Sequence, residues 1–137
     1  MKRVLGIGGV FFKAQDPAAL SSWYVRHLGV PSDPRKGTFF PWRHDDDPER
    51  RAGTVWAPFP TDTGYFAPSA APFMINYVVE DLDAVLAALR AEGVTVDERR
   101  EDHPYGRFGW VMDPEGNRIE LWEPPKADPK ATPDAGA

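Results

Sequence analysis

The order strand, capped helix, glycine occurs twice in this sequence, and it limits the fold more than any other feature. The first copy begins with Gly6 to Ala14, which is rich in β-forming residues and ends before Asp16-Pro17. Asp suits a helix N-cap and Pro the first helical position. An apolar stripe with helical spacing follows, and Gly29 stands where a helix C-cap is expected. The pattern predicts a strand near 6–14 and a helix near 17–28.

The second copy begins after Pro72. Residues 73–79 alternate as a strand, Asp81 can cap a helix, and an apolar stripe runs through 82–92 before Gly93. Further β segments with turn signals are expected at 37–43, 53–59, 95–100, 108–112 and 118–123, the last two joined by a hairpin turn at 113–117. The chain therefore reads as two modules of similar design.

A sheet that is covered by a helix on one face must bury its other face against a second layer. We therefore predict an α+β fold of two tandem βαβββ modules, at about 5–65 and 72–124, within a single domain over 1–124. The antiparallel-rich sheets are expected to pack together around a concave cleft, with the helices outside, and a small molecule is expected in the cleft. Residues 125–137 lack periodicity and are expected to form a disordered tail.

Composition narrows the classes of function. The net charge is -5 and the basic residues are scattered, which argues against a nucleic-acid partner. The absence of cysteine excludes disulfides, thiolate metal sites and a cysteine nucleophile, and leaves three histidines. No apolar run approaches the roughly 20 residues that a membrane span needs. The apolar start is interrupted at Lys13, so we expect a strand there, not a signal peptide, and a cytoplasmic protein.

Two stretches resemble a known family. Residues 113–124 read Asp-Pro-Glu-Gly-Asn-Arg-Ile-Glu-Leu-Trp-Glu-Pro, and residues 23–29 read Trp-Tyr-Val-Arg-His-Leu-Gly. Together with the repeat, they resemble the vicinal oxygen chelate superfamily, which includes glyoxalases, bleomycin resistance proteins and extradiol dioxygenases, over about residues 5–124. The resemblance implies a divalent metal held by four side chains, usually His or Glu. One comes from the first strand and one from the last strand of each module.

In this chain, most of the implied ligand positions hold residues that cannot bind a metal. The first-strand positions fall on Gly9 and Met74, and the strand at 53–59 contains no carboxylate or imidazole. Only Glu120 remains, so no metal and no other cofactor is predicted. Glu120 is then either a retained metal ligand or a carboxylate in the cleft that acts as hydrogen-bond acceptor, general base or ion-pair partner of Arg118.

Strand alternation suggests which side chains face the cleft. It places Glu120 there as the candidate catalytic residue, since Ile119 and Leu121 fall on the helix-covered face. The expected ligand-binding residues are Trp42, Trp56, Met74, Asn76, Tyr105, Arg107, Arg118 and Trp122. Purely structural roles are the alternative: the tryptophans would belong to the core of the sheet, and Asn76 would form hydrogen bonds with neighbouring backbone. The loop from His103 to Arg107 either recognises an anionic group or shuttles a proton, or is solvated.

Two classes of function follow. The first is metal-independent binding of a small aromatic or amphipathic molecule, similar to the bleomycin-binding branch, which tends to be acidic, dimeric and poor in metal ligands. The second is an enzyme of the same superfamily, a lyase, isomerase or dioxygenase. In one version, Glu120 binds a metal together with His103 or a residue of a partner chain. In the other, no metal takes part and Glu120 acts as a general acid or base. A homodimer is expected, because an isolated pair of modules leaves sheet edges and aromatic surface uncovered.

Overall fold

The computed structural model describes residues 2–31, 37–45 and 47–125. The elements in chain order are β1 (Val4–Ala14), α1 (Pro17–Leu28), β2 (Thr38–His44), β3 (Asp47–Pro60), β4 (Phe73–Val79), α2 (Leu82–Ala91), β5 (Val96–His103), β6 (Gly106–Met112) and β7 (Arg118–Glu123). Both predicted helices and the predicted strands are confirmed. The tail expected at 125–137 lies, apart from its first residue, outside the described residues.

Both helices begin as the sequence predicts. The Asp16 carboxylate accepts a hydrogen bond from the amide of Ala19 at 3.0 Å, and Asp81 accepts one from Ala84 at 3.1 Å. These contacts satisfy amides that have no partner within the helix. Gly29 ends α1 with a φ of 68°, in the left-handed region that glycine adopts readily. Neither helix is long and apolar enough to cross a membrane.

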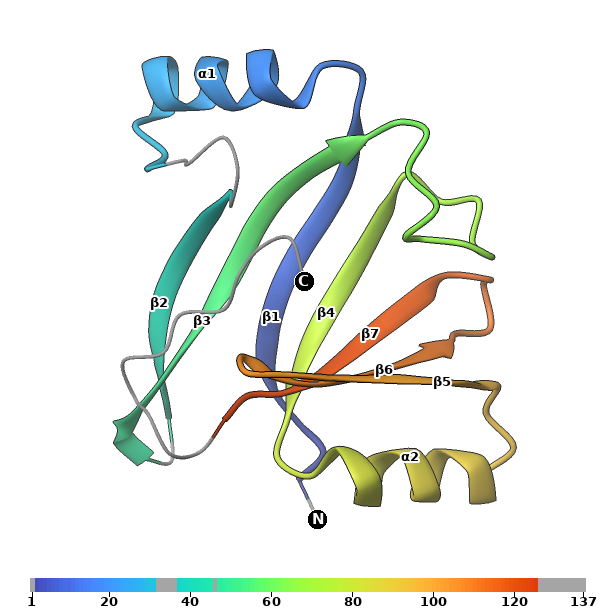
Figure 1. The fold of residues 1–137 in the computed structure, drawn as a ribbon. Coiled ribbons are helices and arrows are strands. Elements are labelled where there is room, and N and C mark those ends of the chain that lie inside the picture. Colours follow the sequence, from blue (N-terminus) through green and yellow to red (C-terminus); the bar gives the residue numbers. More distant parts are fainter. Residues whose placement is uncertain (1, 32–36, 46, 126–137) are drawn as a thin grey trace.

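The strands of the described residues form one seven-stranded mixed sheet in the order β2-β3-β1-β4-β7-β6-β5 (Figure 1). The first strands of the modules, β1 and β4, pair antiparallel at its centre, while β1 pairs with β3 and β4 with β7 in parallel. The α+β class with βαβββ-like modules is confirmed, but the expected pair of face-to-face antiparallel sheets is wrong. The alternation of apolar and polar residues predicts where strands lie, but it does not say which strands become neighbours in a sheet.

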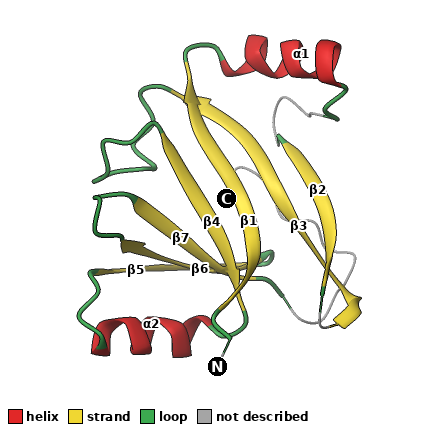
Figure 2. Cartoon of the chain, turned by 180° about the vertical axis from the view of Figure 1, so that it is seen from behind, coloured by secondary structure: helices red, strands yellow, loops and turns green. Residues whose placement is uncertain are grey.

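The two faces of the sheet carry different side chains. We call the face with the larger buried cluster the inner face and the cluster itself the inner cluster. Its buried members are Phe11, Val55, Ala57, Phe66, Met74, Val78, Phe108, Trp110 and Trp122. On the opposite face, α2 packs through Leu86 over Gly109, and α1 contacts the sheet where Tyr24 meets Trp56, with ring centroids 4.9 Å apart. The two helices lie near opposite ends of the sheet (Figure 2).

A glycine in β1 allows the centre of the sheet to close over the inner cluster. A Cβ on Gly8 would lie 2.3 Å from Asn76 Oδ1 and 2.8 Å from the Trp122 ring. Both neighbours are fully packed, so neither can yield easily. We expect Gly8→Ala to lower the free energy of unfolding by about 1–3 kcal/mol, measured by urea denaturation.

Gly64→Ala is the matched control. Nothing lies within 4 Å of a Cβ at Gly64. This variant should stay within about 1 kcal/mol of the wild type, in the stabilising direction. Equal stabilities for the two variants would contradict the close approach at Gly8.

Candidate functional site

The centre of the inner face is a buried carboxylate. Glu120 on β7 is 1% exposed and accepts hydrogen bonds from three side chains. Asn76 Nδ2 donates to Oε1 at 2.6 Å, Trp110 Nε1 donates to Oε2 at 2.9 Å, and the Tyr65 hydroxyl also donates to Oε2. These donors come from β4, β6 and the segment between β3 and β4. A buried charge is tolerable when it is bonded in this way.

Burial and hydrogen bonding act on Glu120 in opposite directions. Burial raises the pKa of its carboxyl above the ordinary value, and the bonds from Tyr65, Asn76 and Trp110 oppose this change without cancelling it. Burial, and then the charge of Glu120, raises the pKa of the Tyr65 phenol. Tyr65 therefore keeps its proton and acts as the donor in this pair.

The sheet register aligns four residues across the centre of the inner face. Gly9 on β1 pairs with Val55 on β3 and with Asn76 on β4, and Asn76 pairs with Glu120 on β7. This row joins the first and last strands of both modules. Met74, the first-strand position that the resemblance implies for the second module, pairs with Phe11 and lies on the same face, two residues from Asn76.

This row does not fit a divalent metal. Val55 and Gly9 offer no ligand atom, and the oxygens of Glu120 accept from an indole N–H, an amide N–H and a hydroxyl. A cation at this carboxylate would face the hydrogens of groups that cannot act as ligands while they donate. Within 2–31, 37–45 and 47–125, no group of three or more His, Asp or Glu side chains is arranged to hold a metal.

The inner face is covered by residues 61–72, which we call the covering segment. Its Tyr65 ring lies nearly parallel to Phe59, with centroids 5.8 Å apart and planes at 13°, and stands edge-on to Trp110. Phe66 from the same segment is fully buried in the inner cluster. Where the sequence suggested an open cleft, the structure therefore has a face filled by the protein's own rings. Glu120, Asn76 and Met74 are at most 2% exposed beneath them.

Arg118 holds the covering segment to the sheet. Its guanidinium donates to the backbone carbonyls of Tyr65 and Ala67, lies 4.9 Å from the Trp110 ring centroid, and pairs with Asp97 at 3.5 Å. The ion pair or hydrogen bond expected between Arg118 and Glu120 is not formed. The guanidinium reaches the loop carbonyls instead, which have no strand neighbour to donate to them.

The structure brings together some of the predicted ligand-binding residues and separates others. Met74, Asn76, Arg118 and Trp122 lie on the inner face, and Tyr105 and Trp42 pack against the margin of its cluster. Trp56 instead contacts Phe12 and Tyr24 on the α1 side. Arg107 also lies on the helix side, where it pairs with Asp83 of α2 at 3.0 Å. Both were expected at the cleft, and strand parity turns them away from it.

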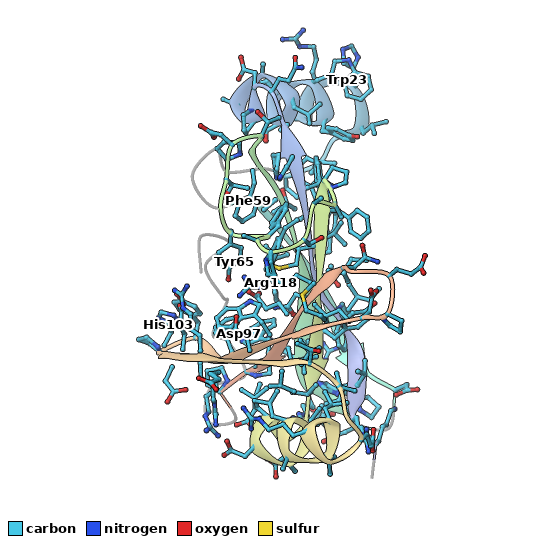
Figure 3. All side chains as sticks on the ribbon, turned by 90° about the vertical axis from the view of Figure 1, so that its right-hand side faces the viewer. Trp23, Phe59, Tyr65, Asp97, His103 and Arg118 are labelled. Carbon is cyan, nitrogen blue, oxygen red and sulfur yellow. The ribbon has the colours of Figure 1, made fainter. Side chains whose placement is uncertain are left out.

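Several residues of this site were not found by the sequence analysis. Figure 3 shows Phe59, Tyr65, Asp97 and His103 on the same side of the sheet, together with Arg118. Tyr65 lies in a segment without periodicity, so nothing in the pattern singled it out. On β5, the signal was a run in which every residue from 97 to 102 is charged and 103 is histidine, so strand alternation turns every second one toward the inner face. It places Glu101 and His103 opposite Phe108 and Gly106 of β6, toward the inner cluster.

Comparison with known proteins identifies one family. The model described as "Glyoxalase/Bleomycin resistance protein/Dioxygenase superfamily" matches residues 6–121. No curated protein sequence gives a significant match.

Solved structures give the same fold at low identity. Methylmalonyl-CoA epimerase from Mycobacterium tuberculosis superposes with a TM-score of 0.58 at 20% identity, covering 91% of each chain. A variant of the Streptomyces coelicolor methylmalonyl-CoA epimerase, in complex with 2-nitronate-propionyl-CoA, gives 0.64 at 17% over 88% of this chain and 98% of that one. The Mn(II)-bound glyoxalase from Novosphingobium aromaticivorans gives 0.59 at 19% over 90% of this chain and 40% of that one.

The raised pKa of Glu120 makes stability depend on pH. Protonation of Glu120 is more favourable in the folded protein than in the unfolded chain, where the carboxyl has its ordinary pKa of 4.5. This contribution is present below that pH and is lost as the pH rises through the folded pKa. The free energy of unfolding of the wild type, relative to Glu120→Gln, should therefore fall as the pH rises above about 4.5, by about 1.4 kcal/mol per unit of pKa change. Denaturant titrations at several pH values would measure it, and a relative stability that rises with pH would contradict it.

Proposed function

The chain belongs to the glyoxalase/bleomycin resistance protein/dioxygenase superfamily, and from this membership we propose that it binds a small aromatic or amphipathic molecule on its inner face without a metal. The observation that carries the proposal is the position of the Tyr65 ring. It already makes the contacts that a bound aromatic compound would make.

The surroundings of Tyr65 define the chemistry of such a ligand. Its ring is stacked on Phe59 and stands edge-on to Trp110, and its hydroxyl donates to Glu120. A ligand that replaces it needs an aromatic ring with a hydrogen-bond donor at one end, because the buried carboxylate can only accept while it is ionised. A phenol is the simplest molecule of this kind.

A second acceptor lies beside the carboxylate. Asn76 Oδ1 is buried and has no hydrogen-bond partner among the described residues. Buried acceptors normally have a donor, whereas this atom lies against Gly8, where a Cβ would come within 2.3 Å of it. Asn76 Nδ2 meanwhile stays on Glu120, which orients the amide.

The covering segment can exchange with a ligand because side chains hold most of it to the inner face, whereas a strand bonds it only at its end, where the Lys13 amide of β1 donates to the Pro72 carbonyl at 2.7 Å. The contacts are the Tyr65 hydroxyl on Glu120, the Arg118 guanidinium on two loop carbonyls, and the buried Phe66 ring. In our proposal Tyr65 swings away when a ligand occupies its place, and Arg118 keeps the segment attached.

The alternative within the superfamily is a metal-dependent lyase, isomerase or dioxygenase. One observation favours this alternative: the solved structures of similar fold include a Mn(II)-bound glyoxalase. The donors around Glu120 count against it here, because they suit an anion and not a neighbouring cation.

The homodimer and the cytoplasmic location remain predictions. Exposed apolar side chains support the dimer: Trp23 is 49% and Leu28 63% exposed on α1, and Phe40 is 41% exposed on the edge strand β2. Apolar surface of this kind is typical of an interface.

Truncating Tyr65 should create a phenol-binding site. We expect phenol to bind Tyr65→Ala and to raise its thermal midpoint in a concentration-dependent way, because the ring fills the vacated space and its hydroxyl reaches Glu120. Toluene, which lacks the hydroxyl, should bind about tenfold more weakly. The wild type should bind phenol more weakly than the variant, because Tyr65 competes.

Tyr77→Ala is the control, since Tyr77 packs on the opposite face of the sheet. Calorimetric titration should show no phenol binding to it. Equal binding to both variants, or no binding to Tyr65→Ala, would remove the basis of the proposed function.

The metal-free part of the proposal has its own measurement. Protein purified without chelators should contain no stoichiometric divalent metal by elemental analysis, because the row of Glu120 offers no second carboxylate and no imidazole. About one Zn, Ni, Fe or Mn per chain that disappears in Glu120→Gln would put the metal-dependent enzyme first.

A further inference from the structure

A histidine and a carboxylate form a pair at the end of β5. His103 Nε2 lies 2.9 Å from Glu101 Oε1. An ionised carboxylate only accepts hydrogen bonds, so Nε2 carries the hydrogen and the lone pair of the neutral ring is on Nδ1. Nδ1 has no hydrogen-bond partner among the described residues. The arrangement is that of a base whose tautomer is fixed by a carboxylate.

Glu101 is itself held in place and charged. It forms a second ion pair with Arg99, and the bond from His103, followed by the charge of Arg99, lowers the pKa of its carboxyl. Arg99 in turn lies 5.7 Å from the Trp110 ring centroid. The carboxylate that orients His103 is thus tied to the inner cluster by a cation.

The imidazole stands at the margin of the inner cluster. Its ring is stacked on Tyr105, with centroids 4.8 Å apart and planes at 6°, and meets the edge of Phe108 at 5.8 Å. Phe108 is stacked in turn on Trp122. About a third of the His103 side chain, 31%, remains exposed. A flat molecule from solvent therefore meets the partly exposed rings of His103 and Tyr105, whereas Phe108 and Trp122 are buried.

We propose that His103 is a general base for flat aromatic compounds that carry an acidic C–H or O–H proton, with Glu101 as its positioning residue. This activity goes beyond the binding function proposed above. It does not require Tyr65 to move, because His103 lies at the rim of the inner cluster and not beneath the covering segment.

A probe reaction can test this without knowledge of the natural ligand. In the ring opening of 5-nitrobenzisoxazole, the base removes the proton from the ring C–H. The C–H electron pair forms the third bond of the nitrile, the N–O bond breaks, and its electron pair remains on the phenolate oxygen. No metal, oxidant or other reactant takes part. The coloured phenolate product gives the rate directly.

The expected result is turnover by the wild type that depends on His103. His103→Gln should lower kcat by about a hundredfold, the lower end of what a positioned base contributes, with KM changed less than threefold. Glu101→Gln should lower kcat by about tenfold at similar KM, because the amide no longer fixes the tautomer. Adding imidazole to His103→Gly should restore turnover, which a purely structural role of His103 would not allow.

His27→Gln is the matched control. His27 on α1 also contacts an aromatic ring, that of Trp23 at 4.9 Å, but no carboxylate among the described residues. Its loss should leave kcat unchanged. Turnover that is equal in His103→Gln and wild type, or absent from the wild type, would overturn the inference. If phenol still binds Tyr65→Ala in that case, the proposed binding function stands and only the catalytic role of His103 falls.

Discussion

The carboxylate of Glu120 is the interaction on which the rest of the inner face depends. It is almost completely buried and accepts from one residue of β4, one of β6 and one of the covering segment. Removing any donor leaves charge in an apolar surrounding, which is costly, so the three elements are held in one arrangement. The aromatic rings around Glu120 pack in one arrangement because only that arrangement gives the buried carboxylate its hydrogen bonds.

The sheet separates two kinds of packing. One face, with Leu82, Leu86, Val111 and Leu121, is an ordinary apolar contact between a helix and strands. The other combines rings with buried polar groups and charged side chains from β5. The buried polar groups around Glu120 therefore lie on the inner face, and α2 packs against the opposite one.

The sequence predicted the elements well because local rules decide them. Asp16 and Asp81 cap the helices as expected, and the alternation around Glu120 gave its correct face. Pairing was not predictable in this way. The register set Asn76 opposite Gly9 and beside Glu120, and parity turned Trp56 toward α1. Tyr65 could not be found, because its role depends on where a segment without periodicity crosses the sheet.

The central β1–β4 pair relates the two modules by an approximate two-fold rotation, since the last strand of each module lies parallel to its first strand and next to it, β3 beside β1 and β7 beside β4. Equivalent positions can be counted from the capping residues Asp16 and Asp81: Phe11 corresponds to Asn76, and Ala57, which pairs with Phe11, corresponds to Glu120, which pairs with Asn76. One half of the molecule holds the polar member of each couple and the other half the apolar member. Ala57 is thus the position equivalent to Glu120, and a protein engineer could introduce a second carboxylate there.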